Sequence, residues 1–77
     1  MTADTLASAP TGAVSVVASV DGPTALVRRL AELGIRPHAV VTPMHRTAGG
    51  GRVVDVAGSR IALADAVLRS IETEPHA

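Results

Sequence analysis

The chain has no aromatic side chain: none of its 77 residues is Phe, Tyr or Trp. Proteins that bind single-stranded nucleic acid stack the bases on aromatic rings, so the sequence argues against that activity. The apolar residues make up 47% of the chain and are mainly Ala and Val, with some Leu and Ile. Because small side chains fill little volume each, we expect one small core and no deep cavity for a substrate.

Cysteine and lysine are also missing. Without cysteine there is no disulfide, no thiolate metal ligand and no thiol nucleophile. The seven basic residues are all arginine, and seven Asp and Glu residues balance them to a net charge of zero. A general nucleic-acid binder needs an excess of positive charge against the phosphates, so we expect no nucleic-acid partner.

Long apolar runs are absent as well. No run approaches the roughly 18–20 residues that span a bilayer, so we expect no direct membrane insertion. Ala7, Ser8 and Ala9 resemble a signal cleavage site, but neither a basic region nor an apolar stretch precedes them. A secretory signal requires both, so we expect a cytoplasmic protein.

The main helix is predicted over residues 24–33. Leu26, Leu30 and Leu33 fall at positions i, i+4 and i+7 of this segment. That spacing places them on one face of a helix, which we expect to close one end of the core.

Both ends of this helix carry recognisable signals. Gly34 stands where a left-handed residue ends a helix, and Pro37 follows shortly after it. Ile35 is then placed to contact Leu30 in a Schellman motif. Thr24 and Asp21 are the two candidate N-caps.

Five short strands are predicted from apolar alternation and turn residues. They cover residues 13–20, 39–46, 52–56, 60–63 and 70–73. A single helical turn is expected at residues 64–68, before the last strand. Pro43 cannot donate to a strand ladder, so we expect an unpaired edge or a bulge there.

The inward side chains of these strands follow from the alternation. In the first strand, one face carries Val14, Val16, Ala18 and Val20. Further along the chain, the side chains expected to point inward are Val54, Val56, Ile61 and Leu63. Gly58 belongs to a tight reversal at residues 57–59.

The fold class expected from these elements is mainly β. Short strands at close intervals, with one helix after the first strand, favour a small closed barrel filled by its own side chains. The expected domain spans residues 10–73, preceded by a loose leader at 1–9 with Leu6 as its anchor and followed by a tail at 74–77.

The order of these residues resembles the FeoA family of ferrous-iron-transport accessory proteins. It also resembles the SH3-like domain at the end of DtxR-type metal-dependent regulators. The resemblance rests on Gly12 before a valine strand, then Arg29-Leu30-x-x-Leu33-Gly34-Ile35-x-Pro37, then Val54-x-Val56-x-Gly58-x-x-Ile61-Ala62-Leu63 and a terminal Ile71.

The resemblance implies a small SH3-like barrel of about five strands with one helix after the first strand. It also implies a cytosolic adaptor without enzymatic activity or cofactor, which binds the cytosolic G-protein part of a FeoB-like membrane transporter. The alternative is a stand-alone SH3-like module of a DtxR-type regulator system. A weak homo-oligomer is a third expectation. The chain departs from the family pattern at His38, where the family usually has the glycine that a positive φ favours.

Metal ligands and catalytic groups are not arranged in any recognisable pattern. The candidate ligands are His38, His45, His76, Asp55 and Asp65, and no His-x-x-x-His or Glu-x-x-His pair occurs. We interpret the histidines as surface residues and predict no metal site. No serine has a neighbouring His–Asp pattern, so we predict no catalytic residue.

Arginine is the one charged residue type that suggests a binding surface. If the helix and the glycine-rich loop at residues 47–51 lie at one rim of the barrel, they form a docking face for an acidic patch. The alternative is an ordinary solvated surface balanced by Glu32, Asp55 and Glu72. The predicted contact residues are Arg28, Arg29, Arg36, Arg46, Gly50 and Arg52.

Overall fold

The computed structural model describes residues 4–76. Its strands form one antiparallel sheet in the order β1-β6-β2-β3-β4-β5. Their bounds are β1 Asp4–Thr5, β2 Ser15–Val20, β3 Val40–Arg46, β4 Arg52–Val56, β5 Ser59–Leu63 and β6 Ile71–Pro75. The helices are α1 Thr24–Glu32, the 3-10 turn η1 Ala48–Gly50 and α2 Asp65–Arg69.

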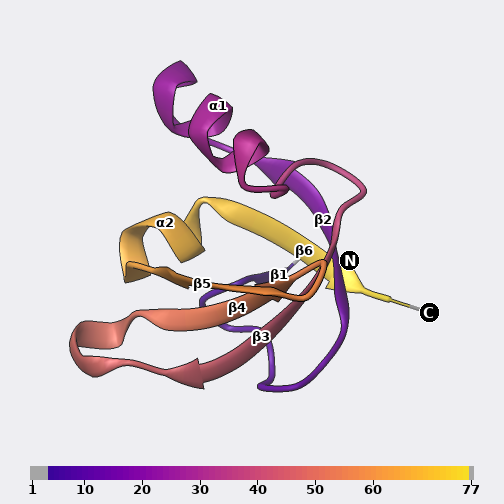
Figure 1. Cartoon of the computed structure of the whole chain (residues 1–77), viewed down its shortest axis with the longest axis vertical. Coiled ribbons are helices and arrows are strands. Elements are labelled where there is room, and N and C mark those ends of the chain that lie inside the picture. Colours follow the sequence, from indigo (N-terminus) through magenta and orange to yellow (C-terminus); the bar gives the residue numbers. More distant parts are fainter. Residues whose placement is uncertain (1–3, 77) are drawn as a thin grey trace.

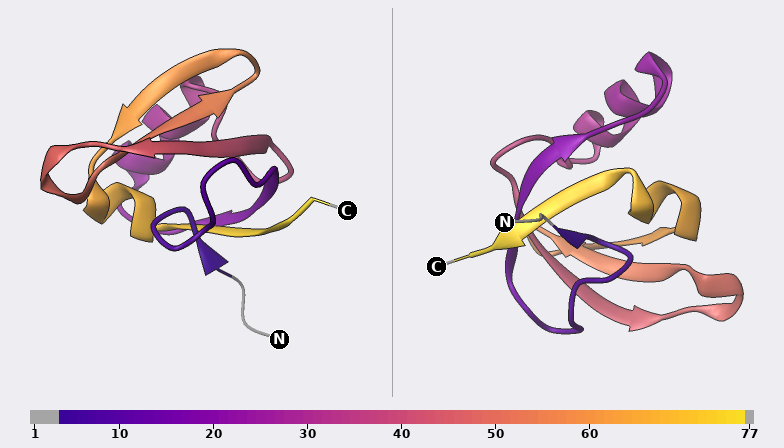
Figure 2. Two further views of the ribbon diagram at one scale, coloured as in Figure 1. Left: turned by 90° about the horizontal axis from the view of Figure 1, so that it is seen from below. Right: turned by 180° about the vertical axis from the view of Figure 1, so that it is seen from behind.

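The sheet is strongly curved, and α1 projects from one end of it (Figure 1). The short helix α2 sits between β5 and β6 in the chain and lies along the sheet near β5 (Figures 1 and 2). This is the mainly β, SH3-like class that the sequence predicts, with one more strand. The concave side holds a core of aliphatic residues: Leu6, Val17, Leu30, Ile35, Val41, Val54, Val56, Leu68 and Ile71.

Helix α1 ends in the Schellman motif that the sequence predicts. Gly34 has φ 95°. Its N–H donates to the carbonyl of Ala31 at 3.0 Å, and the N–H of Ile35 donates to the carbonyl of Leu30 at 2.8 Å. These two bonds satisfy carbonyls that the end of a helix otherwise leaves open. A Cβ on Gly34 would lie 3.2 Å from Cγ1 of Val56, so glycine also permits close packing on β4.

The N-terminal end of α1 corrects the sequence prediction. Pro23 occupies the N-cap position, and no side chain caps the helix. Neither Thr24 nor Asp21 therefore has the predicted role.

The leucine face of α1 is only partly buried. Leu30 is 2% exposed and Leu26 packs against the core as a half-buried residue. Leu33 is 44% exposed, which contradicts its predicted place in the core. The chain turns at Gly34, and Ile35, fully buried, takes the core position instead.

Strand β2 also differs from the predicted pattern. Its fully buried apolar residue is Val17, whereas Val14 lies before the strand and is 46% exposed. A register shift between Val17 and Ser19 in the pairing with β6 interrupts the alternation. Because a bulge changes which residues face the core, Val14, Val16, Ala18 and Val20 do not share one face.

The hairpin of β4 and β5 agrees closely with the sequence. Val54 and Val56 are buried, and Ile61 and Leu63 pack against the core as half-buried residues. Gly58 has φ 86° in the two-residue turn between the strands. Pro43 of β3 lies at the register shift expected for a proline in a strand.

Both chain ends take part in the sheet. Within the predicted leader, β1 pairs with β6, and Leu6 is fully buried. At the other end, β6 continues to Pro75, and Glu74 pairs with Val16. Residues 4–9 and 74–75 are thus part of the domain, while residues 1–3 and 77 lie outside the described residues.

Candidate interaction surface

Arg52 lies in the interior, which removes it from the predicted surface. Its side chain is 1% exposed. Nη1 donates to the carbonyls of Leu6 at 3.0 Å and Ala9 at 2.6 Å, and Nη2 donates to Oγ1 of Thr11 at 2.7 Å. Nε of Arg52 is buried without a hydrogen-bond partner. The guanidinium therefore holds the segment before β2 against β4.

The sequence contains a signal for this burial. Arg52, Val54 and Val56 alternate along one strand, and the two valines are correctly predicted to point inward. The same alternation places Arg52 on the inward side. Burial of the guanidinium lowers the pKa of Arg52, and the nearby charge of Arg46 lowers it further. Arginine still keeps its proton at neutral pH.

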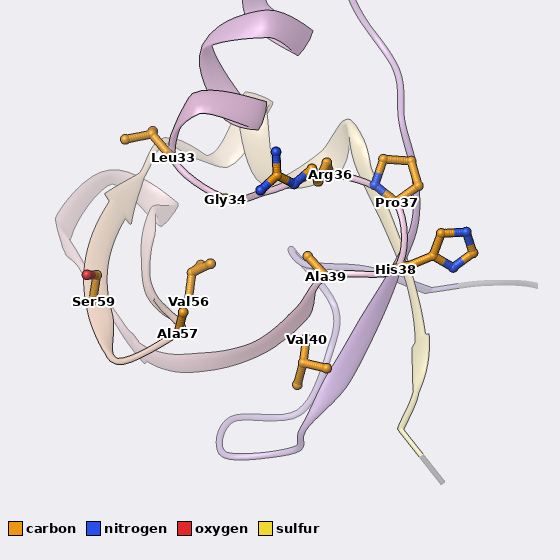
Figure 3. Close-up of a pocket in the computed structure, with 10 residues that line it drawn as sticks. All are labelled: Leu33, Gly34, Arg36, Pro37, His38, Ala39, Val40, Val56, Ala57 and Ser59. Atoms are coloured by element: carbon orange, nitrogen blue, oxygen red, sulfur yellow. The ribbon is translucent and has the colours of Figure 1, made fainter.

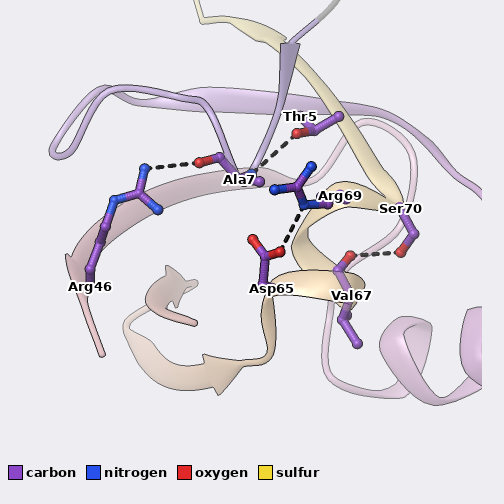
Figure 4. A network of polar contacts seen from close by, with 7 residues as sticks. All are labelled: Thr5, Ala7, Arg46, Asp65, Val67, Arg69 and Ser70. Carbon is purple, nitrogen blue, oxygen red and sulfur yellow. Dashed lines mark hydrogen bonds and ion pairs between the residues drawn. The ribbon is translucent and has the colours of Figure 1, made fainter. Parts of the chain in front are cut away.

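Arg46 is exposed at the far end of β3 and also contacts the N-terminal segment. Its Nη2 donates to the carbonyl of Ala7 at 2.9 Å (Figure 4). Gly50 is exposed in η1 with φ 87°. A side chain at Gly50 would contact Cβ of Asp65 at 3.6 Å. At this end of the molecule, Arg46 is thus engaged in a contact within the chain, and Gly50 lies close to Asp65.

The remaining predicted contact residues, Arg28, Arg29 and Arg36, are exposed on or just after α1. Strand β3 separates this group from Arg46 by a length of about 20 Å. Figure 1 likewise shows α1 and the η1 turn at opposite sides of the molecule. The predicted residues therefore do not form one continuous rim.

A groove lies beside the end of α1, and we name it the Leu33 groove. It has a volume of about 570 Å³ and opens to solvent. The C-terminal end of α1, the α1–β3 turn and the β4–β5 turn form its walls (Figure 3). It is lined by Leu33, Gly34, Arg36, Pro37, His38, Ala39, Val40, Val56, Ala57 and Ser59.

The α1–β3 turn gives one wall of the groove a strained backbone. His38 has φ 77°. The N–H of Ala39 donates to the carbonyl of Arg36 at 3.0 Å, and the N–H of His38 donates to the carbonyl of Val17 at 2.8 Å. Pro37 and His38 thus occupy the central positions of a turn that normally has glycine second. His38, which stands where the family usually has glycine, therefore adopts a left-handed conformation.

The candidate metal ligands are not brought together. Among residues 4–76, no three His, Asp or Glu side chains gather in a way that could hold a metal ion. Asp65 pairs with Nε of Arg69 at 2.8 Å (Figure 4), and Oδ1 of Asp55 accepts from the N–H of Gly58 at 3.1 Å. His38 precedes β3, and His45 lies near the other end of that strand. In the same part of the chain, no helix has the length and apolar character that crossing a membrane requires.

The sequence matches the model of the FeoA domain family over residues 5–75. The chain belongs to the FeoA domain family. No protein with a curated function matches the sequence significantly. The match includes Thr5 of β1 and all of β6.

Solved structures show the same fold at low sequence identity. An iron uptake regulatory protein (FeoA) is 16% identical, with a TM-score of 0.84 over 96% of this chain and 97% of that one. The FeoA protein from Chlorobium tepidum is 23% identical, with a TM-score of 0.86 over 95% of this chain and 70% of that one.

A manganese-dependent transcriptional repressor in complex with manganese contains a similar domain. The two sequences are 18% identical, and the TM-score is 0.86 over 99% of this FeoA-domain chain. This chain corresponds to only 38% of the repressor. The fold is thus used both by itself and as part of larger regulators.

Proposed function

We propose that this FeoA-domain protein is a non-enzymatic cytosolic accessory of ferrous iron transport. It binds the cytosolic G-protein part of a FeoB-like transporter and shifts the equilibrium between transporter conformations. The observation that carries the proposal is the family match over residues 5–75, which includes nearly every described element. The fold of an iron uptake regulatory protein, similar over 97% of that chain, supports the same role.

The packing of the domain favours action through its surface. Its concave side is filled by aliphatic side chains, several of them fully buried. The Leu33 groove is open and has no neighbouring pair of acid and base. A binding protein changes a transporter only if it has different affinities for two of its states. We therefore expect affinity to depend on the nucleotide bound to the transporter.

Calorimetric titration tests this directly. The chain is titrated at low salt into the cytosolic domain of the FeoB-like transporter from the same genome, in the nucleotide-free, GDP and non-hydrolysable GTP states. We expect binding in at least one state and a difference in Kd between states. An absence of heat in all three states, with both proteins shown to be folded, would contradict the proposal.

A second candidate is a module that acts in trans in a DtxR-type regulator system. The specific observation for it is the TM-score of 0.86 to the manganese-dependent repressor. In this case the chain would bind the DNA-binding part of such a regulator and have no affinity for the transporter domain. Titration against both proteins in parallel separates the two functions.

A further inference from the structure

Two large exposed apolar residues line the same groove. Within residues 4–76, the large hydrophobic residues with high exposure are Val14, Leu33 and Val40. Leu33 is 44% and Val40 is 47% exposed, and both line the Leu33 groove. Val14 lies apart from it, beside the start of β2. The groove thus has an exposed apolar residue on two of its walls, and exposed apolar surface with a polar border is typical of a binding surface.

The charges around the Leu33 groove are mainly positive and unpaired. Arg36 and His38 line the groove, and its lining contains no carboxylate. Leu33 also borders a second hollow that includes Arg28 and Arg29, with Glu32 as the carboxylate beside them. Among the described residues, the ion pair that forms is between Arg69 and Asp65, far from this face. The three guanidiniums are thus available to carboxylates of a partner.

Backbone strain is concentrated in the same groove. His38, at φ 77°, and Ala57, at φ 52°, are the non-glycine residues with positive φ within residues 4–76. They belong to two different turns, and both line the Leu33 groove. Glycine would adopt these angles without strain. Two left-handed non-glycine residues in the walls of one groove make it a candidate functional site.

We infer that the Leu33 groove binds an acidic segment of the partner with one apolar side chain between its carboxylates. The apolar side chain packs in the groove against Leu33, and the carboxylates meet Arg36 and the arginines of α1. This inference rests on the proposed function for the identity of the partner, the cytosolic domain of the transporter. It places the contact at α1 and the α1–β3 turn, away from the glycine-rich loop.

Nucleic acid is the competing ligand for unpaired arginines. The chain has zero net charge and no aromatic residue, both of which disfavour a nucleic-acid surface. Apolar side chains at the centre of a surface gain nothing from contact with a charged phosphate backbone. The acidic segment therefore accounts for the leucine and valine as well as for the arginines.

Four single variants of the full chain test the surface, in two matched pairs. Leu33→Gln removes the apolar anchor, and Val14→Gln makes a similar change at an exposed residue elsewhere. Arg36→Glu reverses a groove charge, and Arg46→Glu makes the identical change at the opposite end of β3. Because each control has the same chemistry as its partner variant, general effects of polarity or net charge cancel.

The first measurement is the Kd for the cytosolic domain of the transporter. We expect Leu33→Gln and Arg36→Glu each to weaken binding about tenfold or more, as central contacts of an interface do. The controls are expected to stay within about twofold, as residues outside an interface do. Thermal unfolding of all four variants verifies that they are folded. Equal loss in both members of either pair would overturn the inference.

The second measurement does not depend on the transporter. An isotopically labelled chain is titrated with the peptide acetyl-Glu-Glu-Leu-Glu-Glu-amide, with acetyl-Lys-Lys-Leu-Lys-Lys-amide and with a short DNA duplex. We expect the acidic peptide to shift the amide resonances of Leu33, Gly34 and Val40 and the basic peptide to leave them unchanged. If the wild-type chain does not bind the transporter but the acidic peptide binds the groove, the proposed function is rejected. The assignment of the Leu33 groove as a binding surface for acidic segments is then retained. No shift with the acidic peptide, or a larger response to DNA, would reject the surface assignment itself.

Discussion

Replacement of Arg52 by methionine tests the most unexpected feature of the structure. Methionine keeps an unbranched apolar stem but cannot donate the three hydrogen bonds that the guanidinium makes to Leu6, Ala9 and Thr11. Two of the acceptors are backbone carbonyls of residues that are themselves buried. We therefore expect the segment before β2 to lose its main attachment to β4.

The magnitude follows from two opposing effects. A hydrogen bond from a charged donor contributes about 1.5–3 kcal/mol net, so three bonds to one guanidinium stabilise substantially. Burial of an arginine without a carboxylate partner is unfavourable, and methionine removes that penalty. We expect Arg52→Met to lower the free energy of unfolding by roughly 2–4 kcal/mol, a large part of the roughly 3–5 kcal/mol typical of so small a domain.

Urea denaturation measures the loss, and hydrogen exchange locates it. The amide of Leu6 donates to the carbonyl of Ile71 at 3.0 Å, so its exchange reports whether the segment remains docked. Arg46→Met is the matched control, since this exposed arginine makes a single bond to Ala7. Its expected change is within about 0.5 kcal/mol, as is usual for surface substitutions. Unchanged stability and unchanged protection of Leu6 in Arg52→Met would refute the reasoning.

The pH dependence of this contribution can be stated with its sign. Burial lowers the pKa of Arg52, and Arg46 lowers it further, so the unfolded chain binds this proton more tightly than the folded chain does. Stability therefore rises with pH only where the group titrates, far above neutral pH. Between pH 5 and pH 9 both states keep the proton. The difference in stability between wild type and Arg52→Met is expected to stay constant over that range.

Three further predictions concern the helix, the strained turn and metal ions. Leu30→Ala is expected to lower the free energy of unfolding by roughly 2–5 kcal/mol because Leu30 is buried. Leu33→Ala is expected to lower it by less than about 1 kcal/mol, and equal effects of the two variants in denaturation curves would contradict this. His38→Gly is expected to raise the free energy of unfolding by roughly 0.5–1.5 kcal/mol because glycine adopts a left-handed φ without strain, whereas His38→Val is expected to lower it. A loss of stability in His38→Gly would show that the backbone at this position is not strained. Ferrous or zinc ions are expected to leave the Tm unchanged, and a rise of many degrees would indicate a bound metal.

Local signals in the sequence predicted the parts of the fold that depend on neighbouring residues. The Schellman end of α1 is one example, because Gly34 and Ile35 determine it within a single turn. The bounds of β4 and the turn at Gly58 are another, since alternation and a glycine are sufficient there. Pro43 predicted an irregularity in β3 for the same kind of reason, namely the missing N–H of that residue.

The errors arose where distant segments decide the structure. Strand β1 consists of Asp4–Thr5 and pairs with β6, which lies at the other end of the chain. No local pattern marks so short a strand. Val17 became the buried residue of β2 because a bulge opposite β6 shifts the alternation. Leu33 was predicted to be buried because periodicity identifies a face of a helix, whereas the position of the sheet decides how far that face is covered.

The candidate site was predictable to the same limited degree. Arg28, Arg29 and Arg36 are exposed near α1, and their role as contact residues stays a prediction. Arg52 is buried, whereas the prediction assumed that a charged residue is solvated. The Leu33 groove was missed because two turns that are distant in sequence form it. Its only sequence signal was His38, a residue at a position where glycine is favoured.

The arginines of this protein serve two physical purposes, and lysine substitution separates them. Arg52 uses the two terminal nitrogens of a planar fork to reach acceptors in three residues, and the single nitrogen of a lysine does not reproduce that geometry. Arg52→Lys should therefore lose about half of the stability lost in Arg52→Met, since hydrogen bonds to only some of the acceptors remain. Arg36 makes no such internal contact, so Arg36→Lys should leave the free energy of unfolding unchanged. It should weaken only the binding of the partner, because lysine cannot make a two-point contact with a carboxylate. If both lysine variants behaved alike in stability, the interior role of Arg52 and the surface role of Arg36 would not be distinct.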